Sequence, residues 1–149
     1  MRRHPFFVMI GFKGLLLQMI KDIDRDYKMQ ENDLSRDYVI KKLRFICNSY
    51  ADILGIVILF GSYSRDEAHK TSDIDLYIEP KDLKMTSAKL WKNKRYREFE
   101  YALYDNFPCQ FDLLSYGGKR DIANIRKTPL WKQIEKDGVT IYDQRAEKL

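Results

Sequence analysis

The stretch that decides the fold runs from Leu59 to Glu79 and reads LFGSYSRDEAHKTSDIDLYIE. A continuous apolar run from Ile53 to Phe60 leads into Gly61-Ser62, and ten residues later comes Asp73-Ile74-Asp75. An apolar run of this length is typical of a buried strand. Alternation of polar and apolar residues from Asp73 to Ile78 predicts a second strand. Gly61-Ser62 is expected to end the first strand and to open a short helix.

The two aspartates are expected on one face of the second strand, because side chains at i and i+2 of a strand point the same way. Ile74 and Leu76 then point to the core. Carboxylates this close repel each other unless a cation lies between them. A hard divalent ion with oxygen ligands, such as Mg²⁺, resolves that repulsion. Asp73 and Asp75 therefore predict a metal site.

The Gly61-Ser62 turn is suited to phosphate. Glycine lets the backbone come close to a ligand, and the free N–H groups at the start of a helix attract phosphate oxygens. The Ser62 hydroxyl can add a hydrogen bond. Arg65, one turn on, and Ser72, beside the aspartate pair, complete the candidate nucleotide-binding residues; for Arg65, a surface salt bridge is an equal alternative.

A third carboxylate is expected if two metal ions share the site. Asp112 is the best candidate, because it lies between Phe111 and Leu113 in a strand-like segment, where a lone acid needs a reason. We expect Asp112 to bind the metal nearer the nucleophile and to accept the nucleophile's proton. The alternative is that it caps a neighbouring turn.

The chain also contains a decoy, Asp22-Ile23-Asp24. Its surroundings have helical periodicity, and residues at i and i+2 of a helix diverge by about 200°. No Gly-Ser turn precedes it. We interpret it as a solvated helix face.

The rest of the chain predicts an α+β (mixed α/β) domain in which helices pack on a small mixed sheet. Gln30 to Asp33 reads as a polar break with a helix cap, and Glu79 to Asp82 as a loop. Four helices are expected. The first runs over 12–27, and the second carries Val39, Leu43, Ile46, Cys47 and Tyr50 on one face. The third runs from about Ser87 to Asp105 with Trp91, Phe99, Ala102 and Leu103 in the core, and the fourth runs from Thr128-Pro129 to Gly138. The further strands are Gln110 to Leu114 and Val139 to Tyr142.

Composition is that of a soluble globular chain: 149 residues, 44% hydrophobic, with a net charge of +5. The two cysteines, Cys47 and Cys109, have no metal-binding spacing and are expected to be reduced and buried. Met1 to Ile10 resembles the start of a signal peptide, but Lys13 interrupts it and no cleavage site follows, so a cytoplasmic protein is expected. We divide the chain into an N-terminal helical extension, 1–31, and a catalytic domain, 32–149; Met29 is an alternative start.

Gly-Ser, ten residues, Asp-x-Asp and a distant strand aspartate together resemble the minimal nucleotidyltransferases of the DNA polymerase β superfamily. The resemblance extends from about Leu34 to Tyr142 and implies a polymerase β-like palm fold. It also implies transfer of AMP from ATP to a hydroxyl with Mg²⁺, two ions being expected. Triphosphate binding would fall to Gly61 and Ser62, and metal binding and catalysis to Asp73, Asp75 and Asp112.

Many members of that family are antitoxins that adenylylate a tyrosine of a HEPN-domain toxin, so the resemblance implies a toxin partner. One departure concerns the turn: the family often has Arg-Gly where this chain has Arg65-Asp66, which adds negative charge near the expected triphosphate.

Two other functions remain open. One is transfer to a small molecule such as an aminoglycoside, which the shortness of the chain disfavours. The other is a non-catalytic module that binds a protein partner or nucleic acid and keeps a vestigial site. Binding of nucleic acid by the basic stretch from Lys89 to Arg97 is the less favoured reading of that stretch. A homo- or hetero-oligomer is compatible with either function.

Overall fold

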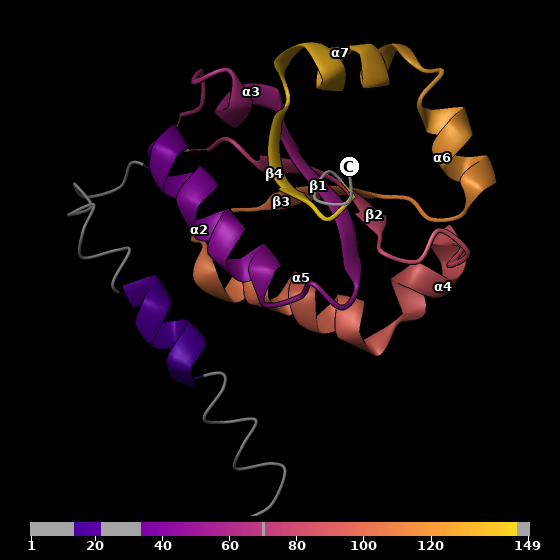
Figure 1. Ribbon diagram of the computed structural model, residues 1–149. Coiled ribbons are helices and arrows are strands. Elements are labelled where there is room, and N and C mark those ends of the chain that lie inside the picture. Colours follow the sequence, from indigo (N-terminus) through magenta and orange to yellow (C-terminus); the bar gives the residue numbers. More distant parts are fainter. Residues whose placement is uncertain (1–13, 22–33, 70, 146–149) are drawn as a thin grey trace, which may run out of the picture.

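The computed structural model describes residues 14–21, 34–69 and 71–145, and a four-stranded mixed sheet lies at its centre (Figure 1). The spatial order of the strands is β3-β2-β1-β4. β1 pairs antiparallel with β2 and with β4, whereas β2 and β3 are parallel. The fold class is therefore the expected α+β arrangement. The strands are β1 (Leu54–Phe60), β2 (Ile74–Pro80), β3 (Phe111–Ser115) and β4 (Val139–Asp143).

Helices cover both faces of this sheet. α2 and α5 lie together on one face, while α6 and α7 arch over the other face, with the short α3 beside them (Figure 1). A further helical segment spans 14–21. The remaining helices are α2 (Arg36–Asn48), α3 (Gly61–Ser64), α4 (Ser87–Lys92), α5 (Lys94–Asn106), α6 (Lys119–Ile125) and α7 (Pro129–Asp137).

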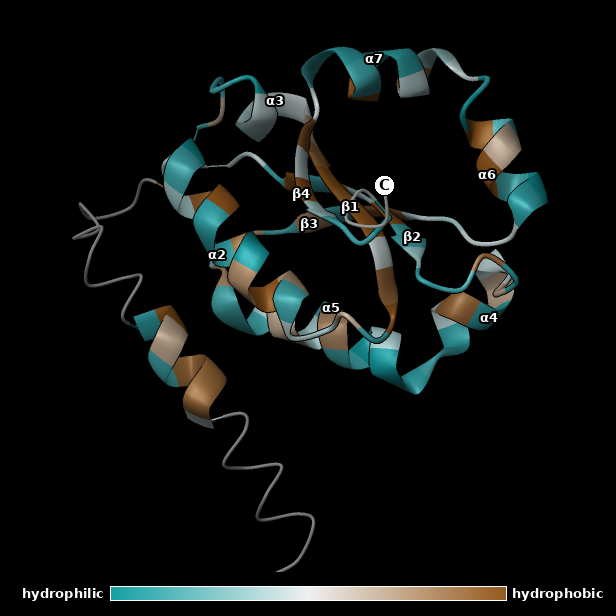
Figure 2. Ribbon diagram, viewed as in Figure 1, coloured by the Kyte–Doolittle hydropathy of each residue, from teal (hydrophilic) through white to brown (hydrophobic). Residues whose placement is uncertain are grey.

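The hydrophobic core lies between the sheet and the pair α2 and α5. β1 runs through the middle as a hydrophobic strand (Figure 2). From β2, Ile74, Leu76 and Ile78 point into this core and are fully buried, as the alternation predicted. The opposite side of β2 therefore carries Asp75, Tyr77 and Glu79.

The single long helix expected from Ser87 to Asp105 is wrong, because the chain breaks at Asn93. Asn93 has an extended backbone, and its side chain accepts a hydrogen bond from the amide of Tyr96, so it caps the start of α5. Because of this break, α4 does not continue the axis of α5 (Figure 1). Phe99 and Leu103 are buried as expected, but Trp91 is 53% exposed, so its assignment to the core is wrong.

Three other expectations need correction. Glu79 and Pro80 belong to β2 and not to a loop. The helix α6 was not expected; its run of seven residues is too short for a clear periodic pattern. The N-cap of α2 is Ser35, whose side chain accepts from the amide of Tyr38.

Most of the remaining elements confirm the sequence predictions, but Tyr50, expected on one helical face with Val39, lies beyond the end of α2. The helix expected over 12–27 is described only over 14–21. α7 begins at Pro129 behind the Thr128 cap, and β1, β3 and β4 fall where strands were expected. Cys47 is buried, whereas Cys109 is only half-buried. In the described part of the chain, no helix has the length and apolar character that a membrane crossing requires. The decoy Asp22-Ile23-Asp24, the break at Gln30 to Asp33 and the signal-like stretch lie outside the described residues.

Candidate active site

The backbone of Gly61 lies against the carboxylate of Asp75. Phe60 pairs with Asp75 across β1 and β2, so the turn that follows Phe60 begins beside that side chain. Gly61 has a φ of +73°, and a Cβ placed there would overlap the Asp75 carboxylate. Glycine is required here both by the backbone conformation and by the close approach. The turn and the aspartate pair, ten residues apart in sequence, therefore form one site.

Asp112 joins this site through the parallel pairing of β2 and β3. Asp75 and Asp112 are partners in the register, so their side chains lie on the same face of the sheet. Asp73 stands just before β2 and is exposed, as is Asp112, whereas Asp75 is half-buried. The structure thus brings together the three acids that the sequence singled out.

The environment of Asp75 disfavours its negative charge. Burial, then the neighbouring Asp112 and Asp73 carboxylates, raise the pKa of Asp75 to about 6, and Arg65 lowers it slightly. A bound cation would offset each of these unfavourable contributions. The site is therefore one in which a divalent ion has an electrostatic reason to bind.

Stability of the metal-free protein is expected to fall as the pH rises from about 4 to about 6. The pKa of Asp75 is higher in the folded chain than its ordinary value of 3.8, so the folded state binds more protons within that window. After allowance for solvent screening, the loss is about 1–2 kcal/mol in the free energy of unfolding. Urea unfolding with a chelator at pH 4.5 and pH 7 measures it. The Asp75→Asn variant should lose less stability over the same interval; an identical loss in both proteins would contradict the assignment.

The donor set fits Mg²⁺ in its chemistry, since three carboxylates lie near one another at one end of β2 and β3. Within the described ranges, no three or more His, Cys, Asp or Glu side chains are arranged to hold a metal ion. Asp73 and Asp112 are exposed, so rotation of their side chains can change the carboxylate spacing.

The other predicted nucleotide-binding residues lie around this centre with differing local partners. Arg65 forms a 3.0 Å ion pair with Glu67, so the salt-bridge alternative is what the structure contains. The Ser72 hydroxyl hydrogen-bonds with the amide and ring of His69. α3 has four residues, so the helix dipole expected to attract phosphate is small. The prediction of phosphate binding therefore rests on the backbone and hydroxyl of Gly61-Ser62.

Asp66 occupies a left-handed backbone conformation, with a φ of +57°. Glycine adopts this conformation without strain, so a glycine at this position would fit the backbone. Aspartate tolerates it and adds a charge.

Replacement of Asp66 by glycine is expected to tighten ATP binding about threefold, because it removes a negative charge near the phosphate turn. Calorimetric titration with ATP and Mg²⁺ measures the affinity. Asp66→Asn is the matched control, because asparagine also tolerates positive φ and lacks the charge. Both variants should bind ATP equally well; tightening in the glycine variant alone would implicate the backbone instead.

A buried charged cluster on β2 was not expected from the sequence. Glu79 is fully buried; its carboxylate accepts from Arg126 at 2.8 Å, from Arg145 at 2.6 Å and from the Tyr77 hydroxyl at 2.6 Å. Trp131 of α7 packs edge-on against Tyr77, with ring centroids 4.9 Å apart. The sequence does contain a signal for this cluster, because polar residues recur at every second position in Asp73, Asp75, Tyr77 and Glu79 and so share one face of the strand. This cluster anchors the segment after α6 and the end of the described chain to the face that carries the site.

A hollow of about 410 Å³ opens beside Asp73. Phe107, Pro108 and Cys109 form its apolar side, and burial raises the pKa of the Cys109 thiol to about 11, so the thiol stays neutral. Lys42 lies 5.0 Å from the centre of the Phe107 ring and is itself buried. The other residues that line the hollow are Thr71, Ser72, Tyr104 and Gln110.

The mixed sheet, the Gly61 turn and the three acids all lie between Lys41 and Asp143. Residues 41–147 match the family described as "Polymerase beta, Nucleotidyltransferase". The chain belongs to that family.

Comparison with solved structures finds proteins of low sequence identity. A crystal structure of a toxin–antitoxin with AMP-PNP is 22% identical, covers 76% of this chain and 77% of that chain, and has a TM-score of 0.43. The structure of a tri-AMPylated Shewanella oneidensis HEPN toxin in complex with MNT antitoxin is 18% identical in sequence. The match covers 76% of each chain and has a TM-score of 0.41. A search of curated proteins finds no match. Family membership rests on the match of residues 41–147 and on neither structure.

Proposed function

We propose that this protein is a Mg²⁺-dependent nucleotidyltransferase that moves AMP from ATP to a hydroxyl, and that the acceptor is a tyrosine of a HEPN-domain toxin. The observation that carries the reaction type is the contact between the Gly61 turn and Asp75, with Asp112 in register beside it. The tyrosine acceptor and the antitoxin role rest on the motif resemblance described above.

The proposal gives each residue of the site a role. Gly61 and Ser62 bind the triphosphate through backbone N–H groups and a hydroxyl, with Arg65 and Ser72 at the margin of the site. Asp73 and Asp75 would hold two Mg²⁺ ions, and Asp112 the ion nearer the nucleophile. When bound, the ions neutralise charge on the phosphates and lower the pKa of the attacking hydroxyl.

The transfer breaks one bond and forms another. The acceptor oxygen attacks the α-phosphorus, and the bond from that phosphorus to the bridging oxygen of the β-phosphate breaks. Pyrophosphate leaves, and Asp112 accepts the hydroxyl proton. The chain's contribution is mainly positioning, because a rigid turn and two paired strands fix the binding groups relative to one another.

The experiment incubates the full chain with ATP, Mg²⁺ and the protein encoded by the adjacent gene, followed by mass spectrometry of the partner. The expected product is an adenylyl group on a tyrosine, absent when a chelator replaces Mg²⁺. A tight complex without modification would support the non-catalytic module instead. Modification of an added aminoglycoside, with the partner unchanged, would support the small-molecule enzyme.

A further inference from the structure

One edge of the sheet is open beside the candidate site. β3 is the terminal strand in the order β3-β2-β1-β4, so β2 pairs with only one of its sides. Asp112, which belongs to the site, lies in this strand. Whatever binds along the outer edge of β3 therefore lies directly beside the proposed metal ligands.

The backbone of Leu113 faces outward from this edge. The amide of Ile74 donates to Gln110 and that of Tyr116 donates to Ile78, so the even-numbered residues of this stretch turn their backbone groups toward β2. The backbone N–H and C=O groups of Phe111, Leu113 and Ser115 then point away from β2, toward the open edge. Within the described residues, the outward amide and carbonyl of Leu113 have no hydrogen-bond partner.

Two aromatic side chains limit the open part of the edge. The Trp91 indole donates to the Ser115 carbonyl at 2.9 Å, and the Tyr104 hydroxyl donates to the Phe111 carbonyl at 3.5 Å. Trp91 is 53% exposed and Tyr104 is 44% exposed, so each stands out from the surface. The unpaired length between them is centred on Leu113 and suits about three residues of extended chain.

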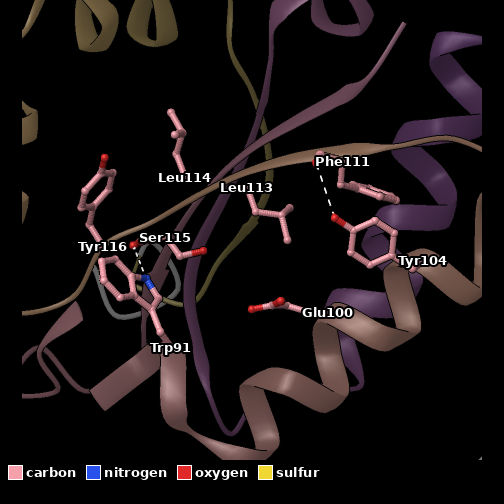
Figure 3. Close-up of a pocket in the computed structure, with 8 residues that line it drawn as sticks. All are labelled: Trp91, Glu100, Tyr104, Phe111, Leu113, Leu114, Ser115 and Tyr116. Carbon is pink, nitrogen blue, oxygen red and sulfur yellow. Dashed lines mark hydrogen bonds between the residues drawn. The ribbon is translucent and has the colours of Figure 1, made fainter. Parts of the chain in front are cut away.

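A hollow of about 360 Å³ surrounds this edge (Figure 3). Leu113, Glu100 and Tyr104 lie on one side of the strand, whereas Leu114 and Tyr116 lie on the other (Figure 3). The side chains of an added strand alternate between two faces, so those on each face would contact residues of the hollow.

Glu100 supplies a charge within the hollow. No described cation forms an ion pair with it, and burial raises the pKa of its carboxyl, with Arg97 lowering it. A cationic side chain placed on this side would complement it. Tyr104 also lines the hollow beside Asp73, so the two hollows adjoin one another along β3.

We propose that the open edge of β3 binds an extended segment of the acceptor polypeptide as an added strand, which presents its hydroxyl to Asp112 and a basic side chain to Glu100. The proposal rests on the proposed function for the identity of the bound segment. An added strand would supply hydrogen-bond partners for the outward amide and carbonyl of Leu113. Because its side chains alternate between two faces, it would place the hydroxyl on the face of Asp112 and the basic side chain on the face of Glu100.

This geometry specifies the spacing in the acceptor. The hydroxyl residue must share the face of Asp112, so the residues directly before and after it share the face of Glu100. Acceptors are therefore expected to carry Lys or Arg next to the modified residue and not two residues away.

The test uses acetylated, amidated tetrapeptides and the full-length Asp75→Asn variant, which should bind without turning over. Nuclear magnetic resonance titration measures affinity and locates binding. Val-Tyr-Lys-Val should shift the Leu113 amide and bind at least threefold more tightly than Val-Tyr-Ala-Lys. Glu100→Gln should remove that difference and leave the weaker peptide unaffected.

N-methylation of the peptide backbone separates strand addition from general apolar binding. Methylating one amide at a time should weaken binding about tenfold at alternate positions only, because only alternate N–H groups face β3. Equal effects at successive positions, or shifts away from β3, would overturn the proposal. So would self-association at this edge that excludes the peptides. Binding in this pattern, with no AMP transfer by the wild-type chain to the peptides or to the partner protein, would refute the proposed function, whereas strand addition at the edge of β3 would stand.

Discussion

Replacing Asp75 with asparagine is expected to reduce AMP transfer on the order of 1,000-fold or more, while the protein remains folded. The substitution preserves the shape of the side chain and its fit against Gly61, and removes the charge that the metal site requires. It also removes repulsion from Asp73 and Asp112. The metal-free variant should therefore be as stable as the wild-type chain or more stable at pH 7.

Initial rates of transfer, measured beside urea unfolding curves, test both expectations together. The matched control is Asp24→Asn, which makes the same change within the identical tripeptide Asp22-Ile23-Asp24. Its transfer rate should stay within about twofold of wild type. An Asp75→Asn protein that keeps most of its activity, or one that loses activity because it unfolds, would remove the support for a metal ligand at this position.

Replacing Glu79 with alanine is expected to lower the free energy of unfolding by about 3–5 kcal/mol. The carboxylate is fully buried and is shared by Arg126, Arg145 and the hydroxyl of Tyr77, so its loss leaves two partly buried guanidinium groups without their anion. The melting temperature should drop on the order of 10 °C for a chain of this size.

The matched comparison is Arg126→Met, which keeps much of the side-chain volume and leaves Arg145 paired with Glu79. Its effect should be no more than about half that of Glu79→Ala, since one charge pair remains. Thermal unfolding followed by circular dichroism measures both variants. Equal losses in the two proteins would show that the carboxylate is not the shared centre of the cluster.

Local patterns sufficed to predict the strands and the proximity of the three aspartates. The apolar run before Gly61, the alternation after Asp73 and the Thr128-Pro129 cap each depend on neighbouring residues, and each prediction is confirmed. The approach of Asp112 to Asp75 required only that two segments form strands of one sheet. The roles of these residues in binding metal and nucleotide stay predictions.

Two features were not predictable in this way: a helix cap inside an apolar helical pattern, and a buried charge whose partners are distant in sequence. Asn93 ends one helix and caps the next, a choice that the apolar periodicity from Ser87 to Asp105 does not reveal. Glu79 continues β2 because Arg126 and Arg145, 47 and 66 residues away, supply the partners for its charge. A buried acid with remote partners reads locally as a loop residue.

The most direct test of the central claim compares two labels in ATP. The full chain is incubated with its partner protein and Mg²⁺, once with ATP labelled at the α-phosphate and once with ATP labelled at the γ-phosphate. A nucleotidyltransferase transfers only the α-label to the partner and releases the γ-label as pyrophosphate. Transfer of the γ-label, or release of γ-label as phosphate with no label on any acceptor, would contradict the account.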